Sequence, residues 1–151
     1  VKYILAFVLD KAGQLNIEQV KTLANGSSAV LANLGLRILS EKAPLEALPI
    51  IRERIYSLSL GESRAAIFLL GDVGELKDID HFYVYLKLVH SIKLKKGMEA
   101  FAAYFERHKD RLLIKEVESF LGELEVLHAE EAFIAYYLED LRHKISITKG
   151  K

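Results

Sequence analysis

Residues 59–71 read SLGESRAAIFLLG, and this stretch introduces the helical period that most of the chain follows. Ser59 and Glu62 have the spacing of a capping box, in which each side chain hydrogen-bonds the other residue's backbone at a helix start. The apolar residues that follow have helical spacing, and Gly71 suits the stop. The stretch therefore predicts a helix that carries one arginine, Arg64, in its first turns.

Apolar side chains recur three and four residues apart along most of the chain, which is the helical period. Asn16 and Gln19 predict a second capping box, with a stop at Asn25–Gly26. Pro49 is expected in the first turn of its helix, where proline is tolerated best. Besides 59–71, helices are expected over residues 16–26, 27–42, 48–58, 71–97, 98–109, 110–127 and 129–144.

Two segments are ambiguous in the sequence. Residues 1–9, VKYILAFVL, fit a helix or a strand, because short apolar runs do not distinguish the two. Residues 144–151, KISITKGK, alternate like a short strand, or form a weakly ordered tail over 145–151. No internal repeat or linker is visible. We predict one compact all-α domain over 1–151 with roughly eight helices, or else two small helical lobes meeting near residues 71–77.

Composition excludes several classes of protein. The 151 residues are 51% hydrophobic, which is enough for a buried core. Lys and Arg number 21, as do Asp and Glu, so a dedicated duplex-DNA binder is disfavoured. The lack of cysteine excludes disulfides, zinc fingers and cysteine-ligated iron–sulfur clusters, and it fits the cytoplasm. The longest apolar run, YILAFVL, falls short of the ~20 residues of a membrane-spanning helix.

No motif predicts an independent enzyme. Nucleophile elbows, Walker loops and dinucleotide-binding glycine patterns do not occur in the sequence. Glu125 and His128 form one Glu-x-x-His pair, whereas a carboxylate-bridged di-iron bundle needs two. Asp140 and His143 imitate the second pair only loosely. We therefore expect neither a metal site nor catalysis by this chain alone.

Arg64 and two runs of charge are the remaining candidates for binding. Arg64 either forms an ordinary ion pair with Glu62 or Asp72, or binds an anion at a helix N-terminus, where negative charge is favoured. Basic residues are frequent over 93–115 and acidic residues over 116–140. These runs indicate either solvated helix faces or a surface that contacts a partner.

Leu48–Tyr83 resembles the first part of the C-terminal domain of the large subunit of archaeal and eukaryotic DNA primases. Pro49, Arg64, Gly74 and the stretch ELKDIDHF occur in the order of that family's pattern. The family has a cluster-binding cysteine after the proline, where this chain has Ile50 and Ile51. The chain is similar instead to the X subunit, a small cysteine-free third primase subunit of some archaea.

The resemblance implies a non-catalytic subunit that binds the initiating (5′) nucleoside triphosphate, ATP or GTP with Mg²⁺, and promotes primer synthesis. Its implied partners are the catalytic and large primase subunits, and contact with template DNA is left open. Arg64 falls on the phosphate-contacting arginine of the family. Arg52 and Arg54 are added as nucleotide-binding candidates because they lie on the preceding predicted helix.

A structural module is the alternative. A small helical subunit of a type III CRISPR RNA-guided effector complex also has this size and lacks cysteine. Such a subunit would bind a nucleic-acid backbone through residues 93–115 and would need no triphosphate pocket. The salt dependence of binding distinguishes the two functions, because many phosphate contacts give a steep slope and a single pocket gives a shallow one.

Overall fold

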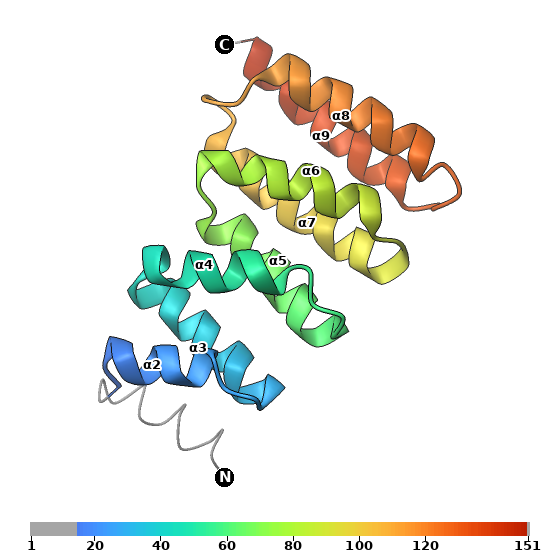
Figure 1. Cartoon of the computed structure of the whole chain (residues 1–151). Helices are drawn as coiled ribbons and strands as arrows, with labels where there is room; N and C mark the ends of the chain where they lie inside the picture. Colours follow the sequence, from blue (N-terminus) through green and yellow to red (C-terminus); the bar gives the residue numbers. More distant parts are fainter. Residues whose placement is uncertain (1–14, 151) are drawn as a thin grey trace. The chain divides into compact units, whose positions relative to one another are not determined.

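The computed structural model describes residues 15–150, and all the regular structure assigned in that range is helical (Figure 1). It comprises eight α-helices and one short 3₁₀ helix. The predicted all-α class and the expected number of helices are therefore confirmed. The ambiguous segment 1–9 lies outside the described residues.

The chain divides into two compact units, Val1–Val73 and Gly74–Lys151. We call them the first unit and the second unit. Their boundary falls within the 71–77 segment, where the sequence allowed two lobes to meet.

The first unit is built from consecutive antiparallel helices. They are α2 (Ile17–Ala24), α3 (Ala29–Lys42), α4 (Pro44–Arg54) and α5 (Leu60–Val73). Each helix packs on the next one, and α3 also packs on α5. Gly35 allows α2 and α3 to approach closely, because a Cβ atom at this position would lie only 2.6 Å from the backbone nitrogen of Ala24. The packing of α3 on α5 later defines the candidate site.

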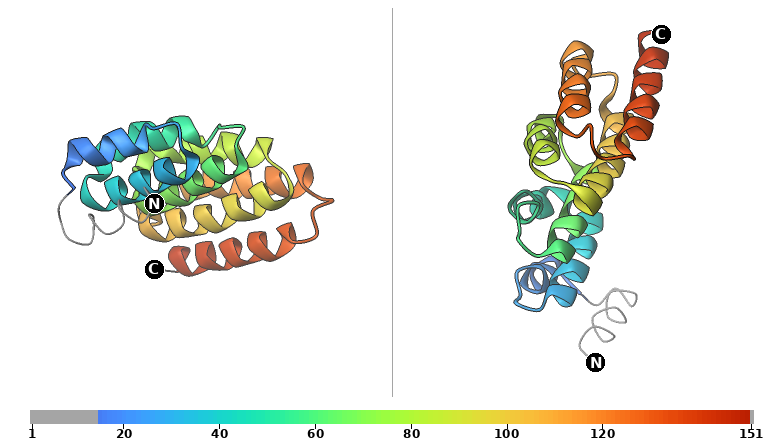
Figure 2. Two further views of the ribbon diagram at one scale, coloured as in Figure 1. Left: turned by 90° about the horizontal axis from the view of Figure 1, so that it is seen from below. Right: turned by 90° about the vertical axis from the view of Figure 1, so that its right-hand side faces the viewer.

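The second unit contains two stacked helical hairpins. After the 3₁₀ helix η1 (Leu76–Asp78) come α6 (Ile79–Leu88), α7 (Ser91–His108), α8 (Ile114–Leu127) and α9 (Ile134–Lys149). The pairs α6–α7 and α8–α9 form the hairpins, while α6 packs on α8 and α7 on α9. Figure 2 shows the α8–α9 hairpin from two further directions. Helical repeat proteins pack in this way, so the repetition lies in the packing although the sequence shows none.

Pro49 is not in the first turn of its helix. That place is taken by Pro44, and Pro49 lies inside α4 with an exposed side chain. The helix therefore begins four residues before the expected start at Leu48. The prediction was wrong because Pro44 satisfies the same rule for a helix start.

The long helix expected over 71–97 is also wrong. The α5 helix continues through Gly71 to Val73, and a second break at Val89–His90 separates α6 from α7. Ser91 has a φ of 54°, and its N–H donates to Glu131 Oε1 at 2.9 Å. Gly97 ends no helix but lies within α7. A Cβ there would come within 3 Å of Leu86 and Tyr85 on α6, so this glycine allows α6 and α7 to pack closely.

The C-terminal segment is neither a strand nor an unstructured tail over the part that the structure describes. Residues 144–149 form the last turns of α9, and Ile145 is buried. Buried side chains on α9 recur three and four residues apart at Ile134, Leu138, Leu141 and Ile145. One face of α9 therefore packs into the hydrophobic core as far as Ile145, which explains why the helix includes the C-terminal segment.

Candidate functional site

The start of α5 is held by a chain of hydrogen bonds through three side chains. Ser59 Oγ accepts from the N–H of Glu62 at 3.4 Å, as the capping-box spacing predicts. The carboxylate of Glu62 instead accepts from Ser57 Oγ at 2.8 Å, and Ser57 Oγ accepts from the N–H of Ser59 at 3.1 Å. In a complete capping box Glu62 would accept directly from the N–H of Ser59, but here Ser57 lies between the two. Glu62 is directed toward Ser57 and does not pair with Arg64.

Arg64 lies in the second turn of α5 and is half-buried. It forms no ion pair or hydrogen bond with any residue in the 15–150 range. Neither Glu62 nor Asp72, the two expected counter-ions, pairs with it there. A partly desolvated guanidinium therefore retains its full capacity to donate hydrogen bonds to an anion.

Arg54 has a different environment. Its Nη2 donates to the backbone oxygen of Ala24 at the C-terminal end of α2, and its Nη1 is buried. Carbonyl groups at a helix end lack partners within the helix, and a basic side chain can satisfy them. Arg54 thus stabilises the first unit through a contact directed toward α2. Arg52 is half-buried two residues earlier, which places it about 200° around α4 from Arg54.

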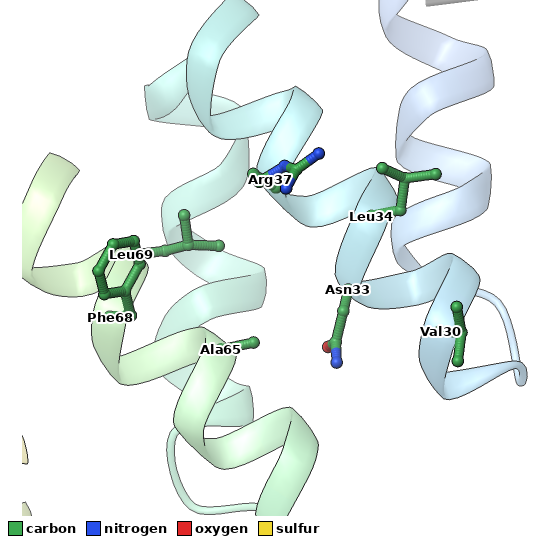
Figure 3. Close-up of a pocket in the computed structure, with 7 residues that line it drawn as sticks. All are labelled: Val30, Asn33, Leu34, Arg37, Ala65, Phe68 and Leu69. Carbon is green, nitrogen blue, oxygen red and sulfur yellow. The ribbon is translucent and has the colours of Figure 1, made fainter. Parts of the chain in front are cut away.

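A groove lies between α3 and α5, and the sequence analysis does not identify it (Figure 3). Its volume is about 350 Å³. Two large apolar side chains at the groove, Val30 and Phe68, are 60% and 62% exposed. The lining residues are Val30, Asn33, Leu34, Arg37, Ala65, Phe68 and Leu69.

Two polar side chains of the groove have unused hydrogen-bonding capacity. Asn33 Oδ1 is buried and accepts no hydrogen bond from the described part of the chain. Arg37 is exposed and forms no ion pair with any residue between 15 and 150. Figure 3 shows Asn33 extending from α3 on the side of Ala65, while Arg37 lies near Leu69. The groove therefore combines apolar walls with one amide and one uncompensated cation.

Arg64 is not among the residues that line this groove, but it precedes one of them, Phe68, by about one helical turn. Residues four apart on an α-helix lie about 6 Å apart along the axis and within 40° around it. Arg64 is four residues before Phe68, so the two share one face of α5. We call Arg64 and the seven groove residues the candidate site.

The residues considered for metal binding each contact a different part of the protein and do not converge on one point. Glu125 pairs with Arg142 at 2.8 Å, and this hydrogen bond lowers the pKa of the Glu125 carboxyl group. His128 is buried, and its Nε2 lies 2.7 Å from the backbone oxygen of Leu86. The sequence analysis does not consider Asp78 and Asp80, which form an Asp-x-Asp pair; Asp78 is buried and accepts from the N–H of Glu75. Within the described residues no three ligating side chains form a group that could hold a metal.

The basic stretch over 93–115 is partly used within the second unit. Lys96 pairs with Glu99 at 3.4 Å, and Lys109 with Glu106 at 2.5 Å. Arg107 donates to the backbone oxygen of Gly74 at 3.1 Å. The exposed side chains without an ion pair in the described range are Lys95, Arg111 and Lys115.

No protein-family model, no curated protein and no solved structure matches the chain. Across residues 15–150, none of the helices is both long enough and apolar enough to cross a lipid bilayer.

Proposed function

We propose that the chain is a cytoplasmic, non-catalytic subunit of a eukaryotic-type archaeal DNA primase. In this role it binds the initiating nucleoside triphosphate, with Mg²⁺, and presents it to the catalytic subunit. The similarity of Leu48–Tyr83 to the primase large-subunit domain supports the proposal. The environment of Arg64 supports it independently.

The observation that carries the proposal is the half-buried Arg64 guanidinium without a counter-ion in the described chain. An arginine early in a helix opposes the helix dipole, so its placement gains nothing from the dipole itself. The same dipole favours an anion beside that end of α5, and the guanidinium adds charge-assisted hydrogen bonds to it. A triphosphate supplies the complementary charge.

Holding one nucleotide is enough for such a subunit to accelerate primer initiation. Joining two free nucleotides costs translational and rotational freedom, and a bound, oriented nucleotide has already lost most of it. Arg64 would fix the triphosphate, while the catalytic subunit supplies the chemistry. Arg54, another of the predicted nucleotide-binding residues, donates to α2 within the first unit. The proposal therefore rests on Arg64.

The test is calorimetric titration of the protein with ATP and with GTP in the presence of Mg²⁺. One charge-assisted contact contributes about 1.5–3 kcal/mol, so Arg64→Ala should raise Kd about 10- to 150-fold. Arg111→Ala is the matched control, since Arg111 is an exposed arginine of the second unit without a described ion pair. Equal affinities for wild type and Arg64→Ala, with dinucleotide synthesis by the reconstituted primase also unchanged, would refute the proposal.

The alternative function is a helical subunit that binds a nucleic-acid backbone. Lys95, Arg111 and Lys115 favour it, because all three are exposed without an ion pair in the described residues. Binding of single-stranded RNA is then expected to weaken steeply with salt. It is also expected to weaken in Arg111→Ala and not in Arg64→Ala, which separates the two functions in a single set of proteins.

A further inference from the structure

We infer that the α3–α5 groove binds the purine base of the same nucleotide. This inference rests on the proposed function, since it extends the triphosphate contact at Arg64 to the rest of the ligand. It concerns four features of the groove: an exposed aromatic ring, an amide, a cation and a suitable volume.

Phe68 supplies a surface for stacking. Its side chain is 62% exposed although it lies beside a groove with apolar walls. A base that stacks on an aromatic ring gains about 1–3 kcal/mol whichever base it is. Since Phe68 follows Arg64 by one helical turn, a base on Phe68 leaves the triphosphate close to Arg64.

Asn33 supplies a hydrogen-bonding group for the edge of the base. An amide presents one acceptor and two donors, and rotation about its last torsion exchanges the oxygen and the nitrogen. The Oδ1 atom has no donor in the described chain, so a ligand N–H would satisfy it once the amide turns toward the groove. A purine base offers an N–H donor beside an acceptor atom on its edge, and an amide can bind such a pair with two hydrogen bonds.

Charge and size also suit a nucleotide. Arg37 adds a second cation that has no ion pair in the described residues, and the lining contains no acidic residue. An anionic ligand therefore meets attraction and no repulsion from the groove. The volume of about 350 Å³ lies within the range of small-molecule sites, about 300–1,000 Å³.

The experiment measures the binding of ATP, GTP, adenosine and tripolyphosphate, each with Mg²⁺, to four proteins and one control variant. The four proteins are the wild type, Arg64→Ala, Phe68→Ala and Asn33→Leu. Tyr136→Ala is the control for Phe68→Ala, because Tyr136 is also an exposed aromatic residue on a helix, 70% accessible in the second unit. Circular dichroism of each variant confirms that the helices are retained.

The groove predicts that Phe68→Ala weakens ATP and adenosine about 5- to 150-fold and leaves tripolyphosphate unchanged. Tyr136→Ala should change none of them. Asn33→Leu should weaken ATP, GTP and adenosine and leave tripolyphosphate unchanged, because it removes the amide that pairs with the base edge. Arg64→Ala should weaken ATP and tripolyphosphate but not adenosine.

Three outcomes are decisive for the inference. Equal binding of ATP and tripolyphosphate, unaffected by Phe68→Ala, overturns the base site and leaves the triphosphate role of Arg64 in place. Adenosine binding that needs Phe68, with no effect of Arg64→Ala on ATP, supports the groove and overturns the proposed function. Failure of both ATP and adenosine to bind at millimolar concentration overturns the groove assignment.

Discussion

Alanine substitution of three helix-interior glycines would measure how tightly each helix is packed. Gly35 lies in α3, Gly97 in α7 and Gly122 in α8. At each position alanine should add about 1 kcal/mol of helix propensity. A Cβ at Gly122 would have no neighbouring atom within 4 Å, so the full gain of about 1 kcal/mol is expected there. The other two positions should lose part or all of it.

Gly35 should show the largest loss. Its Cβ would lie 2.6 Å from the backbone nitrogen of Ala24 and 2.8 Å from Leu23 Cβ. These atoms belong to the main chain and first side-chain atom of α2, so the contact is relieved only if the helices separate. Overpacking costs about 1–3 kcal/mol, and the upper end applies to such a rigid contact. We expect Gly35→Ala to lower the free energy of unfolding by about 2 kcal/mol.

Gly97 should fall between these two cases. Its Cβ would lie 2.7 Å from Leu86 Cδ2 and 2.9 Å from Tyr85 Cε1. The end of a leucine side chain can move, but the Tyr85 ring is buried in the core. Because part of the clash relaxes, Gly97→Ala should change the free energy of unfolding by about 0 to −1 kcal/mol after the propensity gain.

Urea unfolding followed by far-ultraviolet circular dichroism gives the three free energies, compared at a common slope m. Hydrogen exchange then assigns each change to the unit that carries the substitution. The expected order of stability is Gly122→Ala, wild type or Gly97→Ala, and last Gly35→Ala. If Gly35→Ala stabilised the protein as much as Gly122→Ala, the close approach of α2 and α3 would be refuted.

Three further substitutions test individual contacts. Tyr104→Phe removes a hydroxyl that donates to the backbone oxygens of Glu75 and Leu76, at 2.8 and 2.7 Å. It should lower the free energy of unfolding in urea by about 1–3 kcal/mol. Arg54→Ala should cost about 1.5–3 kcal/mol by the same measurement yet leave the calorimetric Kd for ATP unchanged. Burial raises the pKa of Tyr83 to about 12, against about 10 when unfolded, so its contribution to stability is complete below pH ~10 and is lost as pH rises through 12. Over that pH window, the urea midpoint of Tyr83→Phe should therefore fall less than the urea midpoint of the wild type.

Local signals in the sequence predicted much of the helical structure. The capping box of Asn16 and Gln19 is present, with hydrogen bonds of 2.9 and 3.0 Å. The break between α6 and α7 was missed because neither proline nor glycine marks it and the apolar spacing continues across it. That break depends on Ser91, whose backbone N–H is held by Glu131 from forty residues away. Contacts of this kind leave no local pattern.

The candidate site was only partly predictable for a similar reason. Arg64 was identified because a charge in an otherwise apolar helix is visible in the sequence. The groove requires Asn33 and Arg37 of α3 to lie beside Phe68 of α5, and only tertiary packing brings these helices together. Arg54 was grouped with Arg64 by nearness along the chain, although its side chain reaches Ala24, 30 residues away.

The contact between Arg54 and Ala24 has a consequence for biosynthesis. Ribosomes deliver a chain from its N-terminus, so α2 is complete well before the donor for its terminal carbonyl has been made. During that interval the last turn of α2 has one hydrogen bond fewer than in the finished protein. A nascent chain that stops before residue 54 should thus expose the end of α2 to proteases, whereas a chain that includes all of α4 should protect it.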